Sequence, residues 1–109
     1  MNTFGVLIIM KKEQKQLDRL YDAFTRVHSR EEAAAFLEDL CTIKEIQDMA
    51  QRLDAAQMLK NGESYLAIAG EIGISTATIG RVSRALNYGS GGYDLILERM
   101  NEEAEEKND

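Results

Sequence analysis

Apolar residues recur every three or four positions along most of the chain, and this spacing is typical of one face of a helix. The first such stripe spans residues 11–28 and contains Leu17, Leu20, Tyr21, Phe24 and Val27. Ser29 followed by Glu32 has the spacing of a capping box, in which a hydroxyl and a carboxylate satisfy the free N–H groups of a helix start. The pattern therefore predicts two adjacent helices, the second one short.

Thr42 with Glu45 repeats the capping-box spacing and begins the longest apolar stripe, which predicts a third helix over residues 43–61. No proline interrupts the chain, and the stretches between glycines are rich in Ala, Leu, Glu, Lys and Gln. These residues are good helix formers. We therefore expect an all-α fold.

Two short helices separated by a glycine are predicted next. Ser64 can cap a helix over residues 65–72, and Gly73 can end it because glycine adopts a left-handed turn at little cost. Ser75 or Thr76 can then cap the following helix.

The segment 65–84 has the residue pattern of a helix-turn-helix, which needs a small residue where its helices touch, a turn glycine and buried apolar residues at fixed offsets. Ala69 and Gly73 fall on the first two positions when Tyr65 is counted as the first residue. The buried offsets hold Ile68, Ile72, Ile74, Ile79 and Val82. We interpret this segment as a helix-turn-helix.

The second helix of this unit is the candidate recognition helix for a DNA major groove. Arginine can bind guanine, hydroxyls can bind bases or phosphates, and Ala77 can contact a thymine methyl group. Gly80 costs the helix roughly 1 kcal/mol relative to alanine but would permit a close approach to the groove. The candidate DNA-binding residues are Ser75, Thr76, Ala77, Thr78, Gly80, Arg81 and Arg84. The alternative is a helical protein-interaction module in which the helix-turn-helix is only structural.

The net charge of −6 opposes DNA binding, because attraction to phosphates is the main sequence-independent source of affinity. Residues 101–109 alone carry −4, which leaves −2 on residues 1–100. Within residues 75–88 the only charged side chains are Arg81 and Arg84. The position of the charge therefore keeps DNA binding open.

At 109 residues the chain fits one domain. We expect an apolar leader over residues 1–10 outside the fold, a single helix-turn-helix domain over 11–100 and a solvated acidic tail over 101–109. A glycine-rich break at residues 88–92 separates the recognition helix from a last helix that begins near Tyr93. The leader is too short to cross a bilayer, and no basic residue precedes it as in a signal peptide. No membrane association is expected.

Catalysis, metal binding and a cofactor find little support in the residues. His28 is the single histidine and Cys41 the single cysteine, so neither a Ser-His-Asp set nor a zinc cluster can be assembled. The glycines of residues 89–92 lack the lysine and the strand of a nucleotide loop. We expect no enzyme activity and a reducing, cytoplasmic location, with Cys41 as a small buried residue and His28 at a helix end.

Four segments, taken in order and spacing, resemble the YerC/YecD branch of the Trp repressor superfamily. They are residues 39–47, 50–53, 76–84 and 86–93, within a match of about residues 15–95. The resemblance implies a bacterial transcriptional regulator with a six-helix protomer, an intertwined homodimer and a double-stranded DNA operator. Two-fold symmetry then implies a nearly palindromic operator with half-sites roughly 34–36 Å apart.

The resemblance also implies a position for a ligand, since the Trp repressor binds tryptophan between its recognition helix and its third helix. The two arginines of that site match Arg52 and Arg81, and its hydroxyl on the recognition helix matches Thr78. Val82 replaces a glycine beside the indole, and Ala85 replaces the serine that binds the ligand amine. We expect the added methyl groups to fill the space, so that tryptophan does not bind.

Arg52 then needs another role. We favour a surface contact to a DNA phosphate or to a nearby carboxylate over a contact to a corepressor.

Overall fold

The computed structural model describes residues 3–108, within which the chain forms six helices and no strand. The predicted all-α fold is confirmed. The chain divides into two compact units, residues 1–41 and residues 42–109. The helices are α1 (Thr3–Phe24), α2 (Arg30–Leu40), α3 (Ile43–Lys60), α4 (Tyr65–Ile72), α5 (Thr76–Tyr88) and α6 (Gly92–Asn108).

The first unit consists of α1 and α2, and their contact is aromatic. The rings of Phe24 and Phe36 meet edge to face, with centroids 5.4 Å apart. No side chain among residues 8–41 is fully buried. Residues 8–41 therefore form no core of their own.

The start of α1 differs from the sequence prediction. The helix begins at Thr3 rather than at residue 11, so the described part of the apolar leader is helical. No proline separates the leader from the amphipathic stripe, and adding residues to an existing helix is far easier than nucleating one. Residues 1 and 2 of the predicted leader lie outside the described residues.

The cap of α2 departs from a standard capping box. Ser29 Oγ accepts a hydrogen bond from the Glu32 N–H at 3.1 Å, as expected. The Glu32 carboxylate, however, accepts from the His28 N–H at 2.9 Å, one residue before the N-cap. His28 thus lies between the helices and supports the cap through its backbone.

The second unit begins with the capping box of α3, which has the predicted geometry. Thr42 Oγ1 accepts from the Glu45 N–H at 3.1 Å, and Glu45 Oε1 accepts from the Thr42 N–H at 2.8 Å. The Thr42 backbone N–H, and after it the Thr42 side chain, hold the pKa of the Glu45 carboxyl below its ordinary value. The charged carboxylate therefore stabilises the helix start.

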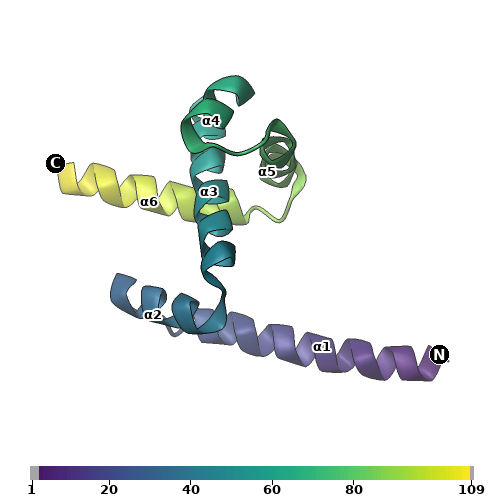
Figure 1. The fold of residues 1–109 in the computed structure, drawn as a ribbon. Coiled ribbons are helices and arrows are strands. Elements are labelled where there is room, and N and C mark those ends of the chain that lie inside the picture. The colour runs from purple at the N-terminus through teal and green to yellow at the C-terminus, as the bar shows by residue number, and fades with distance from the viewer. Residues whose placement is uncertain (1–2, 109) are drawn as a thin grey trace. The chain divides into compact units, whose positions relative to one another are not determined.

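The hydrophobic core lies where α4, α5 and α6 pack against α3 (Figure 1). Ala55 and Ala56 provide the α3 side of this contact, and their small side chains allow the other helices to approach closely. Burial of one isoleucine side chain contributes about 1.5–3 kcal/mol. The fully buried residues are Ala55, Ala56, Ile68, Ile79, Val82 and Leu97.

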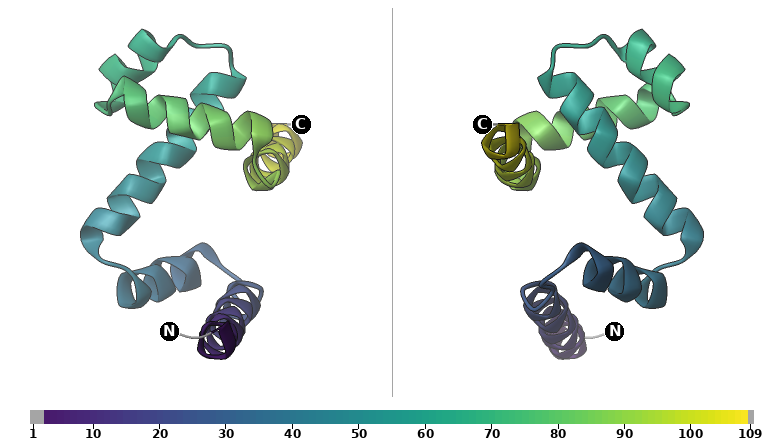
Figure 2. Two further views of the ribbon diagram at one scale, coloured as in Figure 1. Left: turned by 90° about the vertical axis from the view of Figure 1, so that its right-hand side faces the viewer. Right: turned by 90° about the vertical axis from the view of Figure 1, so that its left-hand side faces the viewer.

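The last helix runs across α3 in Figure 1, and both views of Figure 2 look almost along its axis. Leu97 is 2% exposed and anchors it, while Lys60 Nζ lies 2.9 Å from Asp94 Oδ1 and 3.9 Å from Glu98 Oε1. These ion pairs are partly exposed, so the burial of Leu97 contributes more. The helix continues through Asn108, so the predicted acidic tail extends α6, and the side chains of residues 101–107 are exposed. Asp109 lies outside the described residues.

Candidate nucleic-acid interface

The turn between α4 and α5 has the geometry that a helix-turn-helix requires. Gly73 adopts φ +80°, a left-handed conformation that favours glycine, and its N–H donates to Ala69 O at 2.9 Å. Ser64 caps α4 by accepting from the Ala67 N–H, and Ser75 caps α5 by accepting from the Thr78 N–H, each at 3.1 Å. Both helices therefore start where the sequence predicts, and α4 also ends there.

The residues at the buried positions of the helix-turn-helix form part of the core. Ile68 and Ile79 are 0% exposed and Val82 is 3% exposed. The other predicted positions, Ala69, Ile72 and Ile74, are partly buried against the same cluster. Because α5 is held along this inner side, its opposite face is fixed in position and open to solvent.

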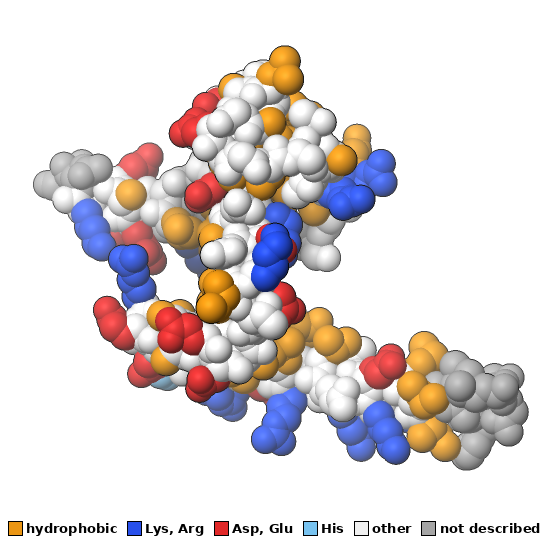
Figure 3. All heavy atoms as spheres, in the orientation of Figure 1, with side chains coloured by type: hydrophobic (Ala, Val, Ile, Leu, Met, Phe, Trp, Pro, Cys, Tyr) orange, Lys and Arg blue, Asp and Glu red, His pale blue; other side chains and the backbone are white. Residues whose placement is uncertain are grey.

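The outward face of α5 is basic. Thr76, Ala77, Arg81 and Arg84 are exposed, and Gly80 is half-buried between them. α5 carries no acidic residue, and neither arginine forms an ion pair with another described residue. Figure 3 shows basic side chains beside this helix. Such a surface suits a polyanion.

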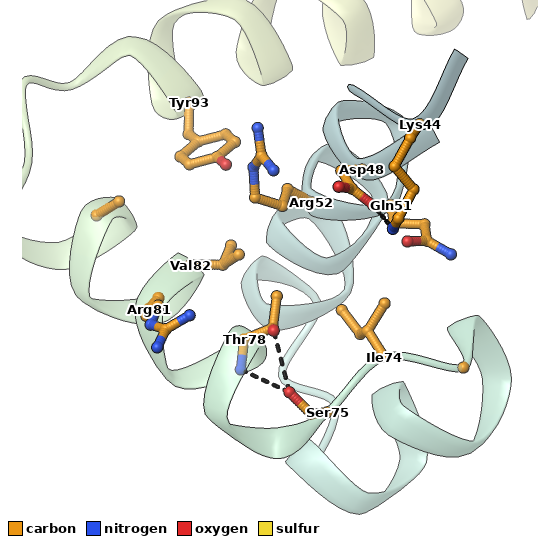
Figure 4. Close-up of a pocket in the computed structure, with 12 residues that line it drawn as sticks. Lys44, Asp48, Gln51, Arg52, Ile74, Ser75, Thr78, Arg81, Val82 and Tyr93 are labelled. Atoms are coloured by element: carbon orange, nitrogen blue, oxygen red, sulfur yellow. Dashed lines mark hydrogen bonds and ion pairs between the residues drawn. The ribbon is translucent and has the colours of Figure 1, made fainter. Parts of the chain in front are cut away.

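A cleft of about 750 Å³ lies behind this face, between α3 and α5. Figure 4 shows Arg52 of α3 pointing toward Tyr93 of α6, with Thr78, Arg81 and Val82 of α5 on the other wall. The sequence prediction missed Tyr93. Its spacing of four residues from Leu97 indicated only an apolar helix face.

The predicted DNA-binding residues are divided between the outward face and this cleft. Ser75 and Thr78 line the cleft, and Arg81 contributes to both surfaces, because it lines the cleft and is exposed on the outward side of α5. Thr78 Oγ1 lies 3.0 Å from Ser75 Oγ, so these two hydroxyls hydrogen-bond each other at the start of α5. Thr78 is half-buried, and its role in DNA binding stays a prediction.

Val82 and Ala85 line the cleft and do not fill it. A cleft therefore remains beside these two residues, and the exclusion of tryptophan stays a prediction. Val82 is 3% exposed and also belongs to the core, so its side chain contributes both to the core and to the wall of the cleft. The alanine at position 85 still offers no hydroxyl to a ligand.

Arg52 is exposed at the edge of the cleft and has no carboxylate within ion-pair distance among the described residues. The nearby Asp48 instead pairs with Lys44 one helical turn before it. The predicted contact of Arg52 to a neighbouring carboxylate is therefore absent from the described structure. A contact to an external anion remains consistent with it.

The remaining candidate residues give no second site. Cys41 is half-buried at the end of α2, not buried as predicted, and its N–H donates to Leu37 O at 2.8 Å. Within residues 3–108 no group of three His, Cys, Asp or Glu residues is placed to hold a metal ion. In the same part of the chain, no helix is long and apolar enough to cross a membrane.

These features define a six-helix protein of the helix-turn-helix class, in which α4 and α5 form the motif. The chain matches the family described as Trp repressor protein over residues 15–101, and it belongs to that family. This is a family with a regulator fold and not an enzyme family.

Relatives support the same assignment. YerC of Bacillus subtilis is 48% identical over 94 residues, which cover 86% of this chain and 90% of YerC. A TrpR-like protein from Eubacterium eligens has a TM-score of 0.76 at 45% identity, with 80% of this chain and 90% of that chain covered. A candidate Trp repressor from Staphylococcus aureus also has a TM-score of 0.76, at 49% identity and coverages of 80% and 87%.

Proposed function

We propose that this protein is a cytoplasmic, sequence-specific DNA-binding transcriptional regulator, which binds a palindromic operator as a homodimer and represses by occluding a promoter. The observation that carries the proposal is the outward face of α5. A rigidly held helix there presents Arg81 and Arg84 and itself carries no acidic residue. Arginine at such positions can bind guanine O6 and N7 with both of its terminal nitrogens.

The overall acidity of the chain is compatible with this proposal because the acidic residues gather elsewhere. Glu102, Glu103, Glu105 and Glu106 are exposed near the end of α6. The attraction of DNA for a protein is screened over about 8 Å at physiological salt, so the charges nearest the phosphates dominate. Binding by α5 should accordingly be sensitive to salt.

The homodimer is supported by apolar side chains that the single chain leaves exposed. In the first unit Figure 3 shows hydrophobic side chains along one edge of α1 and basic side chains along the other. In the second unit α6 exposes Leu95, Ile96 and Met100. A second copy that covers such surfaces would supply the burial that α1 and α2 lack.

We further propose that tryptophan is not the corepressor. The cleft has room for a small molecule, but Ala85 provides no hydroxyl for a ligand amine, and an unpaired buried amine costs several-fold in affinity. Calorimetry with millimolar L-tryptophan should therefore show no saturable heat. A saturable heat, together with tighter DNA binding, would overturn this part of the proposal.

The decisive experiment is a selection of bound fragments from random double-stranded DNA, followed by affinity measurements on the selected operator. Arg81→Ala should weaken specific binding by about 1–3 kcal/mol and relax the preference at one base pair. Arg99→Ala is the matched control, because Arg99 is an exposed arginine of α6 outside the proposed interface. The Arg99→Ala variant should bind the selected operator with the same affinity as the unmodified chain.

The second candidate function is a helical protein-interaction module with a structural helix-turn-helix, which the net charge of −6 favours. The same selection separates the two functions. The interaction module is the better description if no DNA sequence is enriched and if Arg81→Ala does not change the affinity of any residual DNA binding.

A further inference from the structure

Tyr88, the last residue of α5, is the large hydrophobic side chain that the described structure exposes most. It is 87% exposed, whereas the tyrosine that lines the cleft, Tyr93, is half-buried. Its hydroxyl makes no hydrogen bond with any described residue. Nothing within the described chain therefore accounts for an aromatic ring at this position.

The register of α5 places Tyr88 on the same outward face as the two arginines. Ala77, Arg81, Arg84 and Tyr88 follow one another at intervals of four, three and four residues. With 3.6 residues per turn, these four positions fall within about 60° of one another around the helix axis. The buried residues Ile79 and Val82 lie on the other side. Tyr88 is thus the C-terminal end of the face that we propose for DNA.

The chemistry of tyrosine suits the edge of a DNA interface. Its ring can pack on the apolar part of a deoxyribose, and its hydroxyl can donate a hydrogen bond to a phosphate oxygen. Tyr88 also lies four residues after Arg84, so a helix that directs Arg84 to the groove directs Tyr88 to the bordering strand.

We propose that Tyr88 contacts the DNA backbone, with its ring on a sugar and its hydroxyl on a phosphate, and fixes the C-terminal end of α5 on the operator. This inference rests on the proposed DNA-binding function. It assigns Tyr88 a positioning role that is distinct from base reading, so its loss should weaken binding to all sequences to a similar degree.

The test compares Tyr88→Phe, Tyr88→Ala and Arg84→Ala on the selected operator by fluorescence anisotropy at several salt concentrations. Tyr88→Phe should bind roughly threefold to tenfold more weakly, and Tyr88→Ala should lose more because the ring contact is lost as well. Neither should change the slope of log affinity against log salt, because tyrosine carries no charge. Arg84→Ala should reduce that slope by about one.

Two controls sharpen the result. Tyr21→Phe makes the same chemical change on an exposed tyrosine of α1 and should leave affinity unchanged. A neutral methylphosphonate placed at each operator phosphate in turn should identify one position where the effect of Tyr88→Phe disappears.

Three other outcomes would each contradict the Tyr88 proposal, and they differ in what they say about DNA binding. If Tyr88→Ala binds the operator like the unmodified chain while Arg84→Ala does not, the Tyr88 proposal is wrong and DNA binding stands. If light scattering shows that Tyr88→Ala no longer forms dimers, the ring belongs to an interface between copies and the proposal is wrong. If the unmodified chain binds no DNA, both proposals fail.

Discussion

Gly80 shows how one residue can have opposite effects on folding and on binding. A methyl group at this position would meet no atom within 4 Å, so packing inside the protein does not require glycine. Gly80→Ala should therefore raise the free energy of unfolding by about 0.4–1 kcal/mol, because alanine restricts the unfolded chain and favours the helix. Affinity for the operator should fall, because the added methyl group keeps α5 away from the groove.

Gly70 provides the matched control for this prediction. It lies within α4, it is exposed, and a methyl group there would also meet nothing within 4 Å. Gly70→Ala should increase stability in urea denaturation by a similar amount and leave DNA affinity unchanged. Equal affinity for both variants would show that the space at Gly80 has no role in binding.

The sequence predicted the inner residues of the helix-turn-helix, whereas the DNA-binding role of its outer residues stays a prediction. Ile68, Ile79 and Val82 could be placed because burial repeats with the helical period. The hydrogen bond between Thr78 and Ser75 could not be predicted, because the helical period does not encode side-chain contacts of this kind.

At the scale of single elements, the stability that the start of α3 contributes should depend on pH. The pKa of Glu45 is lowered in the folded chain, so the unfolded chain takes up its proton at higher pH than the folded chain does. The stabilisation is therefore complete above the ordinary carboxyl pKa of about 4.3, and it is lost as pH falls through the lowered value. Stability should decline over this acidic range.

Glu45→Gln isolates this contribution, because glutamine keeps the size of the side chain and does not titrate. Thermal unfolding of both proteins between roughly pH 7 and pH 3 should show a stability difference that narrows as pH falls. A difference that is constant over this range would mean that the charge of Glu45 does not support the helix.

Helix boundaries were predictable where caps mark them. Thr42, Ser64, Gly73 and Ser75 each fixed an end of α3, α4 or α5, and those ends agree with the structure. The start of α1 carries no comparable signal. Its position depends on how far an existing helix extends through residues that neither favour nor stop it.

At the scale of the whole molecule, stability should depend on protein concentration. Residues 8–41 contain no fully buried side chain, so we expect α1 and α2 to depend on a partner surface for their stability. We expect a mass near twice 12.2 kDa in light scattering and a Tm that rises as the protein is concentrated. A monomeric mass with a Tm independent of concentration would contradict the homodimer.

The family and the fold were accessible from the sequence because several segments agree in order and spacing. The resemblance also placed the α3 and α5 walls of the cleft, but not the contribution of α6, which lies far from α3 in the chain. Tyr93 illustrates this: only the packing of α6 across α3 brings its ring opposite Arg52.

If the chain binds DNA as we propose, the course of α6 influences the orientation in which protein and duplex first meet. This helix starts beside α5 and carries four exposed glutamates, at positions 102, 103, 105 and 106, toward its far end. Positive charge on α5 and negative charge at that distance give the second unit a permanent electric dipole. In the field of a duplex such a dipole experiences a torque that turns α5 toward the phosphates before contact. The acidic end of α6 would then raise the fraction of collisions that begin in the correct orientation, even though it lowers the attraction between protein and DNA.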